Sequence, residues 1–162
     1  SGREAFSSIM YDGVIPYSAL LKNDDIVFVR SNGSKSLVGR SVLVRDIDFD
    51  LTYSGFCIRF RKQRVDFDSK FILYAMWSNK FREVIDSYTR GTNITNVSQD
   101  MLKNVLLPEI SLHKQLEIVK KLDVVCAEID NSLLEKNTQR DILCEYKKSL
   151  IYEYVTGKKE VI

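Results

Sequence analysis

The side chains in this sequence that could do chemistry are mainly basic, and many of them lie between residues 30 and 64. This stretch holds eight lysines and arginines against three aspartates and no glutamate. Such a local excess of positive charge is typical of surfaces that contact phosphate groups. A solvated strand face of mixed charge is the alternative interpretation, and the net charge of +2 for the whole chain does not decide between the two.

The sequence shows no pattern that builds a catalytic or metal site. A methyltransferase acting on a base amino group needs a Gly-rich cofactor loop and a Pro-Pro-aromatic turn, whereas the two prolines, Pro16 and Pro108, stand far apart. The spacing from Gly33 to Gly39 does not fit a phosphate-binding P-loop. A single histidine, His113, excludes His-rich metal sites. These patterns favour binding over catalysis.

Composition indicates an ordinary globular protein, with 44% hydrophobic and 28% charged residues. The three cysteines contain no C-x-x-C pair, which favours reduced thiols and a cytoplasmic location. No apolar run approaches the ~18 residues of a membrane-spanning helix. No leader for export is recognisable at the start of the sequence.

Three short runs in the first part of the chain predict β-strands. Residues 25–30 are apolar, β-branched and aromatic and end at a Ser-Asn-Gly-Ser turn, and residues 37–44 form a second such run. In residues 53–61 apolar and polar side chains alternate. Arg59 and Arg61 are therefore expected on one face of this strand, opposite its apolar residues.

A helical period follows the strands. Apolar and aromatic side chains recur every three or four residues from Tyr74 to Tyr88, with Ser69 as the candidate N-cap, and we interpret this stripe as core packing. Ser98 is the candidate cap of a short helix, and residues 105–107 predict a buried strand. Residues 1–110 are therefore expected to form an α/β (α+β) domain.

From Leu112 onward the sequence predicts a long, coiled-coil-forming helix. Neither glycine nor proline occurs from 109 to 156, and a helix over 111–155 would be roughly 67 Å long. Polar residues at 136–140 indicate either a turn between two helices or a polar layer that sets register. With Leu112 at heptad position a, the apolar a and d positions are expected to pair with a second helix, from the same domain, a twin chain or a partner: Leu112, Val119, Leu122, Cys126, Ile129, Leu133, Leu143, Leu150 and Tyr154.

Taken together, these segments resemble the specificity subunits of type I restriction–modification systems. The chain looks like one target recognition domain, residues 1–110, followed by one conserved helical spacer, residues 111–162. A subunit of this family normally carries two of each, so the chain is expected to be the C-terminal half of a subunit, a truncated product, or a natural half-subunit that pairs with itself. The resemblance rests on residues 25–33, 38–40, 53–56, 91–92 and 96–98 in the first part, and on residues 106–108, Gln115, 118–119, 122–123, 129–130, 146–151 and 155–157 in the second.

The resemblance implies a non-catalytic protein that gives a larger complex its DNA sequence specificity. Subunits of this family recognise one half of a bipartite double-stranded DNA target with each recognition domain. Their spacer helices hold the methyltransferase (M) subunits, and restriction (R) subunits join that complex. S-adenosylmethionine, Mg²⁺ and ATP belong to those partners, so no cofactor is expected on this chain. Pairing through the spacer helices, as in a homodimer, is expected, and a membrane is not.

In this setting, basic side chains would fix register on phosphates and polar side chains on loops would read base edges in the major groove. Arginine can bond guanine at O6 and N7, and asparagine can bond adenine at two points. A structural role in a turn, cap or strand stays open for each residue. The candidate DNA-contacting residues are Arg30, Ser31, Asn32, Ser34, Lys35, Arg40, Arg59, Arg61, Thr92, Asn93 and Asn96.

Two other interpretations fit the same sequence. One is a coiled-coil assembly protein whose α/β head binds protein instead of DNA, and a steep salt dependence of DNA binding would separate it from a specificity subunit. The other is the recognition tail of a fused restriction–methylation enzyme, which the sequence of the parent gene upstream of residue 1 would reveal.

Overall fold

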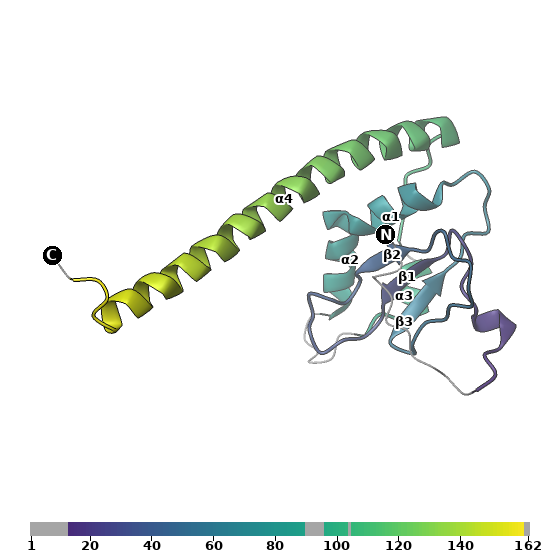
Figure 1. Ribbon diagram of the computed structural model, residues 1–162. Coiled ribbons are helices and arrows are strands. Elements are labelled where there is room, and N and C mark those ends of the chain that lie inside the picture. Colours follow the sequence, from purple (N-terminus) through teal and green to yellow (C-terminus); the bar gives the residue numbers. More distant parts are fainter. Residues whose placement is uncertain (1–12, 90–95, 104, 161–162) are drawn as a thin grey trace. The chain divides into compact units, whose positions relative to one another are not determined.

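The computed structural model describes residues 13–89, 96–103 and 105–160 and contains three strands and four α-helices within them (Figure 1). The chain divides into two compact units, Ser1–Val119 and Lys120–Ile162, and each is described by itself. In chain order the elements are a short 3₁₀ helix (Tyr17–Ala19), β1 (Ile26–Val29), β2 (Ser41–Leu43), β3 (Cys57–Phe60), α1 (Ser69–Trp77), α2 (Asn79–Thr89), α3 (Gln99–Lys103) and α4 (Leu112–Val155).

The three strands form one antiparallel sheet in the order β2-β1-β3. Ile26 and Phe28 of the central strand β1 are fully buried, while the residues between and after them are partly exposed, so one face of the sheet is apolar. The register pairs Ile26 with Phe60 and Val29 with Cys57, so the start of β3 lies beside the end of β1. The α/β class and the three expected strands are confirmed.

The second and third strands are shorter than the sequence predicts because turns take up their first residues. Before β2 the chain turns at Gly39, whose φ of +85° lies in the left-handed region that favours glycine. Before β3 the amide of Cys57 donates to the carbonyl of Ser54 in a turn. Phe56, which the alternation places on the apolar face, lies in this turn and is 69% exposed, so that placement is wrong.

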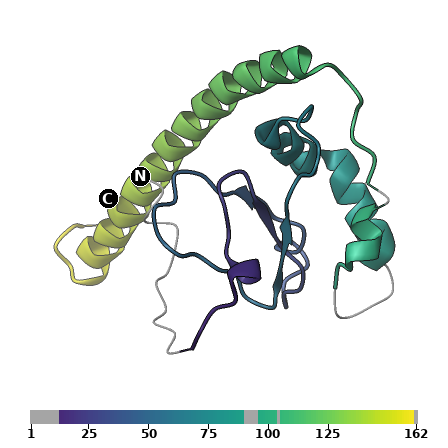
Figure 2. The same ribbon diagram turned by 90° about the vertical axis from the view of Figure 1, so that its right-hand side faces the viewer.

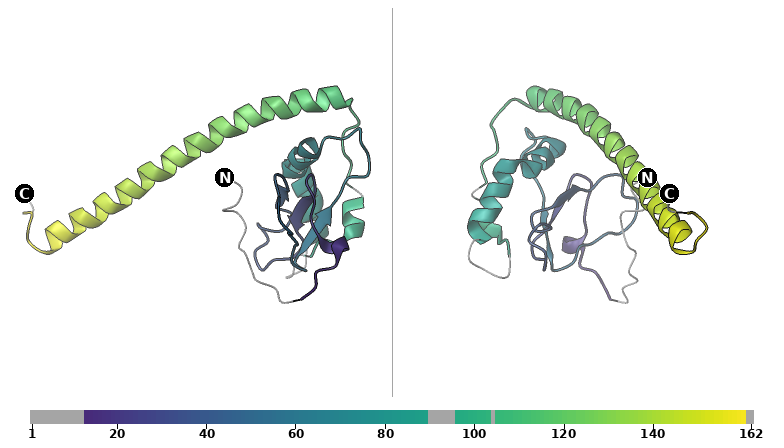
Figure 3. Two further views of the ribbon diagram at one scale, coloured as in Figure 1. Left: turned by 45° about the vertical axis from the view of Figure 1, so that its right-hand side comes forward. Right: turned by 90° about the vertical axis from the view of Figure 1, so that its left-hand side faces the viewer.

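Helices α1 and α2 lie on the same side of the sheet (Figures 2 and 3). Their apolar side chains pack against β1, and α3 and the following segment supply partly buried side chains to the same core. The buried members from α1 and α2 are Phe71, Ile72, Leu73, Met76, Phe81 and Ile85. The core-packing interpretation of the aromatic stripe is therefore correct for most of it, although Trp77 stays half-exposed.

Two details of this helical region differ from the prediction. Asp68, not Ser69, caps α1, because its carboxylate accepts hydrogen bonds from the backbone N–H groups of Lys70 and Phe71, each at 2.9 Å. The stripe is also divided into two helices at Ser78, whose ψ of 152° is extended. The hydroxyl of Ser78 donates to the carbonyl of Ala75 and accepts from the amide of Phe81, so it satisfies both helix ends.

The segment between α3 and α4 was expected to contain a strand and does not. Residues 105–110 have no regular secondary structure. Val105 and Leu107 pack against the core, but Leu106 between them is 90% exposed. Two of the three apolar side chains therefore anchor this segment on the core, although the segment forms no strand. The short helix predicted after Ser98 is present as α3, and the Ser98 hydroxyl accepts from the amide of Met101.

The long helix is confirmed as α4, which runs for 44 residues without interruption (Figure 3). It continues through residues 136–140, so the alternative of a turn there is wrong. It ends at a glycine C-cap, where Gly157 has a φ of +71° and its amide donates to the carbonyl of Tyr154. In the part of the chain that the structure describes, no helix is long and apolar enough to cross a membrane.

Candidate nucleic-acid interface

Three segments that are far apart in the sequence meet where β1 ends. The amides of Arg30 and Ser31 both donate to the carbonyl of Phe56, at 2.8 and 3.2 Å. The carbonyl of Arg30 accepts from the amide of Val97 at 3.0 Å, and Ser31 forms an isolated β-bridge with Asn96. We call the surface formed by Arg30, Ser31, Asn32, Arg40, Phe56 and Asn96 the β1-end surface; Ser31 is half-buried and the other five residues are exposed.

A side-chain hydrogen bond joins two of the predicted DNA-contacting residues on this surface. Nε of Arg30 donates to Oδ1 of Asn96 at 2.9 Å, across 66 positions of sequence. Both side chains are exposed. Because the backbone around each of them is also hydrogen-bonded to the other segment, the pair is fixed from two sides.

Arg40 reaches the same end of the sheet through the chain connection between β1 and β2. The carbonyl of Arg40 accepts from the amide of Val29 at 2.8 Å, and the amide of Gly39 donates to the carbonyl of Val29 at 2.9 Å. Arg40 therefore lies beside the last residue of β1, next to Arg30. Among the residues that the structure describes, no carboxylate forms an ion pair with Arg30 or Arg40. Their charges remain available for an anionic ligand.

The loop after β1 is held in shape by its own polar side chains. Oδ1 of Asn32 accepts from the amide of Ser34 at 2.9 Å, an Asx turn, and the hydroxyls of Ser34 and Ser36 are hydrogen-bonded to each other at 2.9 Å. The side-chain oxygens of Asn32 and Ser34 thus already have structural roles. Both residues, and Lys35 beside them, are exposed.

Arg82 is a residue of this region that sequence reasoning missed. From α2 its guanidinium donates to the carbonyls of Val38 and Lys35, at 2.7 and 3.0 Å, and it is 2.8 Å from the carboxylate of Asp86. It therefore fixes the loop that carries Lys35 and leads to Arg40. Nothing in the local sequence distinguishes it from an ordinary charged residue on a solvated helix face, because its loop partners, Val38 and Lys35, lie more than 40 positions away.

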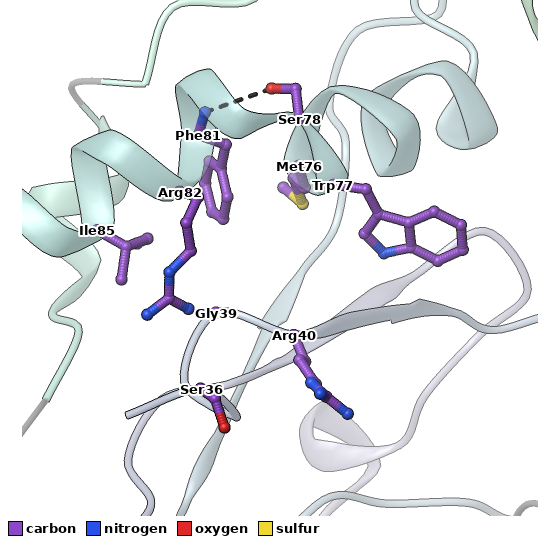
Figure 4. A pocket seen from close by; sticks show the side chains of 9 residues that line it. All are labelled: Ser36, Gly39, Arg40, Met76, Trp77, Ser78, Phe81, Arg82 and Ile85. Atoms are coloured by element: carbon purple, nitrogen blue, oxygen red, sulfur yellow. Dashed lines mark hydrogen bonds between the residues drawn. The ribbon is translucent and has the colours of Figure 1, made fainter. Parts of the chain in front are cut away.

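Beside this loop there is a shallow depression of about 210 Å³ (Figure 4). Figure 4 shows Arg82 reaching toward Gly39 across it, whereas the guanidinium of Arg40 points away from α1 and α2. The half-exposed Trp77 is fixed at its edge, because its indole N–H donates to the carbonyl of Ser41 at 3.1 Å. The lining residues are Ser36, Gly39, Arg40, Met76, Trp77, Ser78, Phe81, Arg82 and Ile85.

Arg59 of β3 and Arg61, the first residue after that strand, both donate to the carbonyl of Leu20, as expected for side chains on one face, but they lie toward the other end of β1. Arg59 donates to the carbonyls of Ser18 and Leu20, at 2.7 and 3.2 Å. Arg61 binds both carboxylate oxygens of Asp25, each at 2.6 Å, and also the carbonyl of Leu20. These bonds tie residues 18–25 to the sheet.

The ion pair between Arg61 and Asp25 is the most buried one that the structure describes. The side chain of Asp25 is 1% exposed and that of Arg61 is 32% exposed. Hydrogen bonding to Asp25 raises the pKa of Arg61 above its ordinary value, so the guanidinium stays charged. This arrangement separates Arg59 and Arg61 from the β1-end surface. Two further candidates, Thr92 and Asn93, lie outside the described residues.

The predicted helix-pairing residues divide between the two units. Val119 is buried in the core of the first unit, and the first-unit residue Leu112 is exposed. In the second unit the remaining positions are partly or largely exposed in the single chain: Leu122, Cys126, Ile129, Leu133, Leu143, Leu150 and Tyr154. An apolar row of this length on one helix is the surface that a second helix would cover.

No family model matches this chain. It is 29% identical over 145 residues to the type I restriction enzyme EcoKI specificity subunit of Escherichia coli K12, covering 90% of this chain and 31% of that protein. It is 28% identical over 144 residues to the StySPI specificity subunit of Salmonella potsdam, covering 89% of this chain and 31% of that protein. It is also 25% identical over 162 residues to the MjaVIII specificity subunit of Methanocaldococcus jannaschii, covering 98% and 36%.

The chain spans about a third of the length of these curated relatives, 31–36%. All three are named as specificity subunits of type I restriction enzymes. The resemblance inferred from the sequence is therefore confirmed, and the chain is similar along nearly its whole length to type I restriction enzyme specificity subunits.

Proposed function

We propose that this chain is a non-catalytic DNA-specificity unit of a type I restriction–modification complex and recognises one half of a bipartite DNA target. The observation that carries the proposal is the β1-end surface. Two arginines without an ion pair among the described carboxylates, an asparagine and an exposed aromatic ring come to one end of the sheet from three separate segments. The similarity to specificity subunits supports the same conclusion.

On this surface some residues would contact phosphates and others would contact base edges. Arg40 and Lys35 would neutralise phosphates and fix the register of the protein on the duplex. Arg30 and Asn96 would face base edges, because their side chains are held in place while their outer polar atoms remain exposed. Arg59 and Arg61 would act through the fold by holding residues 18–25 against the sheet.

Helix α4 would serve assembly. Its exposed apolar row would pair with a second helix, in a homodimer or in a longer subunit, and the resulting helices would hold methyltransferase subunits that restriction subunits then join. At 1.5 Å per residue its 44 residues span roughly 66 Å, about two turns of duplex DNA, so the helix could set the distance between half-sites. S-adenosylmethionine, Mg²⁺ and ATP would be bound by those partners.

A filter-binding assay over a range of salt concentrations tests DNA binding at the β1-end surface. The double variant Arg30→Glu with Arg40→Glu is compared with Arg45→Glu with Arg64→Glu, which makes the same charge change at residues outside this surface. We expect the first pair to weaken duplex binding by about tenfold or more, because it removes one base-facing and one phosphate-facing cation. The slope of log affinity against log salt should fall by about one, the contribution of the phosphate-facing Arg40. The control pair should keep most of the affinity.

Thermal unfolding of both double variants checks that they are folded. Equal loss of binding in the two pairs would show that only net charge matters, and unchanged binding in the first pair would show that the β1-end surface does not face DNA.

A further inference from the structure

We propose that Arg30 and Asn96 form one unit that reads a guanine in the major groove, with Arg30 contacting the base and Asn96 acting as its positioning residue. The proposal deepens the proposed function and rests on it, since it assumes that the β1-end surface faces duplex DNA. It assigns a base to this site, and it gives Asn96 a role other than the two-point contact with adenine expected from its residue type.

The first step is the identity of the atoms that meet. Nε of arginine is a hydrogen-bond donor only, so the atom of Asn96 that lies 2.9 Å from it is the acceptor Oδ1. The amide nitrogen Nδ2 of Asn96 is then left as a donor. The bond also uses the Nε edge of the guanidinium and leaves Nη1 and Nη2 as the exposed fork. No described residue makes a hydrogen bond or ion pair with these two atoms.

The second step is the chemical character of the exposed tip. Nη1 and Nη2 of Arg30 and Nδ2 of Asn96 all carry N–H groups, so the pair presents several donors to an incoming base. Guanine presents two adjacent acceptors, N7 and O6, on its major-groove edge. Adenine and cytosine each place an exocyclic amino donor there, and thymine has one acceptor beside a methyl group. Guanine is therefore the base that fits this tip best.

The third step is the rigidity of the pair. The amide of Arg30 is bound to the carbonyl of Phe56 at 2.8 Å, and its carbonyl is bound to the amide of Val97 at 3.0 Å, so its backbone is clamped between two segments. The bond to Asn96 then restrains the side chain. A guanidinium that is already oriented loses less conformational freedom on binding, and its planar fork makes two hydrogen bonds at once.

Selection from a library of random duplexes tests the proposal. The unmodified chain is incubated with the library at low salt, bound duplexes are sequenced, and the preference at each aligned position is calculated. We expect one position at which guanine is preferred by roughly tenfold or more, the range of a good two-point contact. In Arg30→Lys, which keeps the charge but loses the fork, that preference should fall to within about threefold.

Two variants of Asn96 separate positioning from simple structural support. Asn96→Leu removes the acceptor, and we expect the guanine preference to weaken although the chain stays folded by thermal unfolding. Asn96→Asp keeps an oxygen acceptor for Nε of Arg30, so the preference should return even though the added negative charge lowers overall affinity. Arg45→Lys makes the same chemical change as Arg30→Lys outside the β1-end surface and should leave the preference as it is.

The outcomes distinguish this proposal from the function on which it rests. If the unmodified chain binds no duplex at low salt, the proposed function and this inference both fail. If it binds duplexes but prefers guanine at no position, or if Arg30→Lys keeps the full preference, this inference alone fails. If Asn96→Asp loses the preference as completely as Asn96→Leu, the positioning role of Asn96 is overturned.

Discussion

Gln115 accepts a hydrogen bond through its side-chain oxygen from the backbone N–H of Asp68, at 2.9 Å, and so ties the first turns of α4 to the residue that caps α1. Its amide nitrogen donates to the carbonyls of Asp66 and Ile110, at 2.9 and 2.8 Å. The residue is 0% exposed. Gln115 occupies a heptad d position, where an apolar residue would be expected. Its polar atoms are hydrogen-bonded inside the first unit, so it does not interrupt the exposed apolar row of α4.

Replacing this glutamine should destabilise the first unit. Gln115→Leu keeps the volume similar but leaves one backbone N–H and two carbonyls without their buried partner, and we expect the free energy of unfolding to fall by about 2–3 kcal/mol. Chemical denaturation followed by circular dichroism measures the loss. The matched control is Gln63→Leu, an exposed glutamine, which should change stability by less than about 0.5 kcal/mol. Equal effects would mean that the three hydrogen bonds contribute nothing.

The ion pair between Arg61 and Asp25 should matter for folding. Arg61→Ala leaves the carboxylate of Asp25 buried without its counter-charge, and we expect a loss of about 3 kcal/mol in the free energy of unfolding. Arg45→Ala breaks a pair with Asp24 in which both side chains are about half exposed, at 3.4 Å, and should have an effect below about 1 kcal/mol. Urea titrations of the two variants compare them directly, and similar midpoints would contradict a special role of the buried pair.

Two glycines of the same loop should respond differently to alanine. Gly39 has a left-handed φ of +85°, so Gly39→Ala should destabilise the chain by about 1–2 kcal/mol through backbone strain, whereas the new Cβ would make only an ordinary contact with Ile85 at 3.5 Å. Gly33 lacks a left-handed φ and has open space around its Cα. Gly33→Ala should therefore be close to neutral. Differential scanning calorimetry shows the contrast, and an unchanged midpoint for Gly39→Ala would rule out strain at this position.

The exposed apolar row of α4 should cause self-association of the chain. Leu122→Asp with Ile129→Asp places two charges in the row, and we expect the assembly to disperse to the 18.7 kDa mass of one chain. Asn131→Asp with Thr138→Asp adds the same charge at exposed f positions of the same helix and should keep the larger mass. Light scattering coupled to size-exclusion chromatography measures both. A single-chain mass already in the unmodified protein would contradict pairing between copies.

The elements with a strong local pattern could be predicted from the sequence. The core of each strand, the short helix after Ser98 and the uninterrupted helix Leu112–Val155 follow from apolar periodicity and from the absence of glycine and proline over residues 109–156. The predictions were wrong at two helix boundaries, where one local hydrogen-bonding side chain decides the boundary and the apolar periodicity does not. Asp68 outcompetes Ser69 as the cap because its carboxylate can accept two amide hydrogen bonds, and Ser78 divides one expected helix in two.

The candidate interface was predictable only as a set of residue types. Eight basic residues within 30–64 predicted a basic region. Their positions in the sequence could not show that Arg61 forms an ion pair with the buried Asp25, or that Arg82 binds the loop before Arg40. Those outcomes depend on partners more than 30 positions away. Local periodicity carries no information about such pairs.

The amino-acid sequence by itself determined that this protein has an α/β head and a 44-residue helix with an apolar row, because side-chain periodicity acts between near neighbours. Only the tertiary structure decided which polar residues meet. In the folded chain Arg30 is hydrogen-bonded to Asn96 across 66 positions, whereas Arg59 binds the carbonyl of Leu20 and Arg61 binds the carboxylate of Asp25. The reason is that strand pairing and core packing fix the path of the backbone, and that path sets which donors and acceptors come within reach of each other.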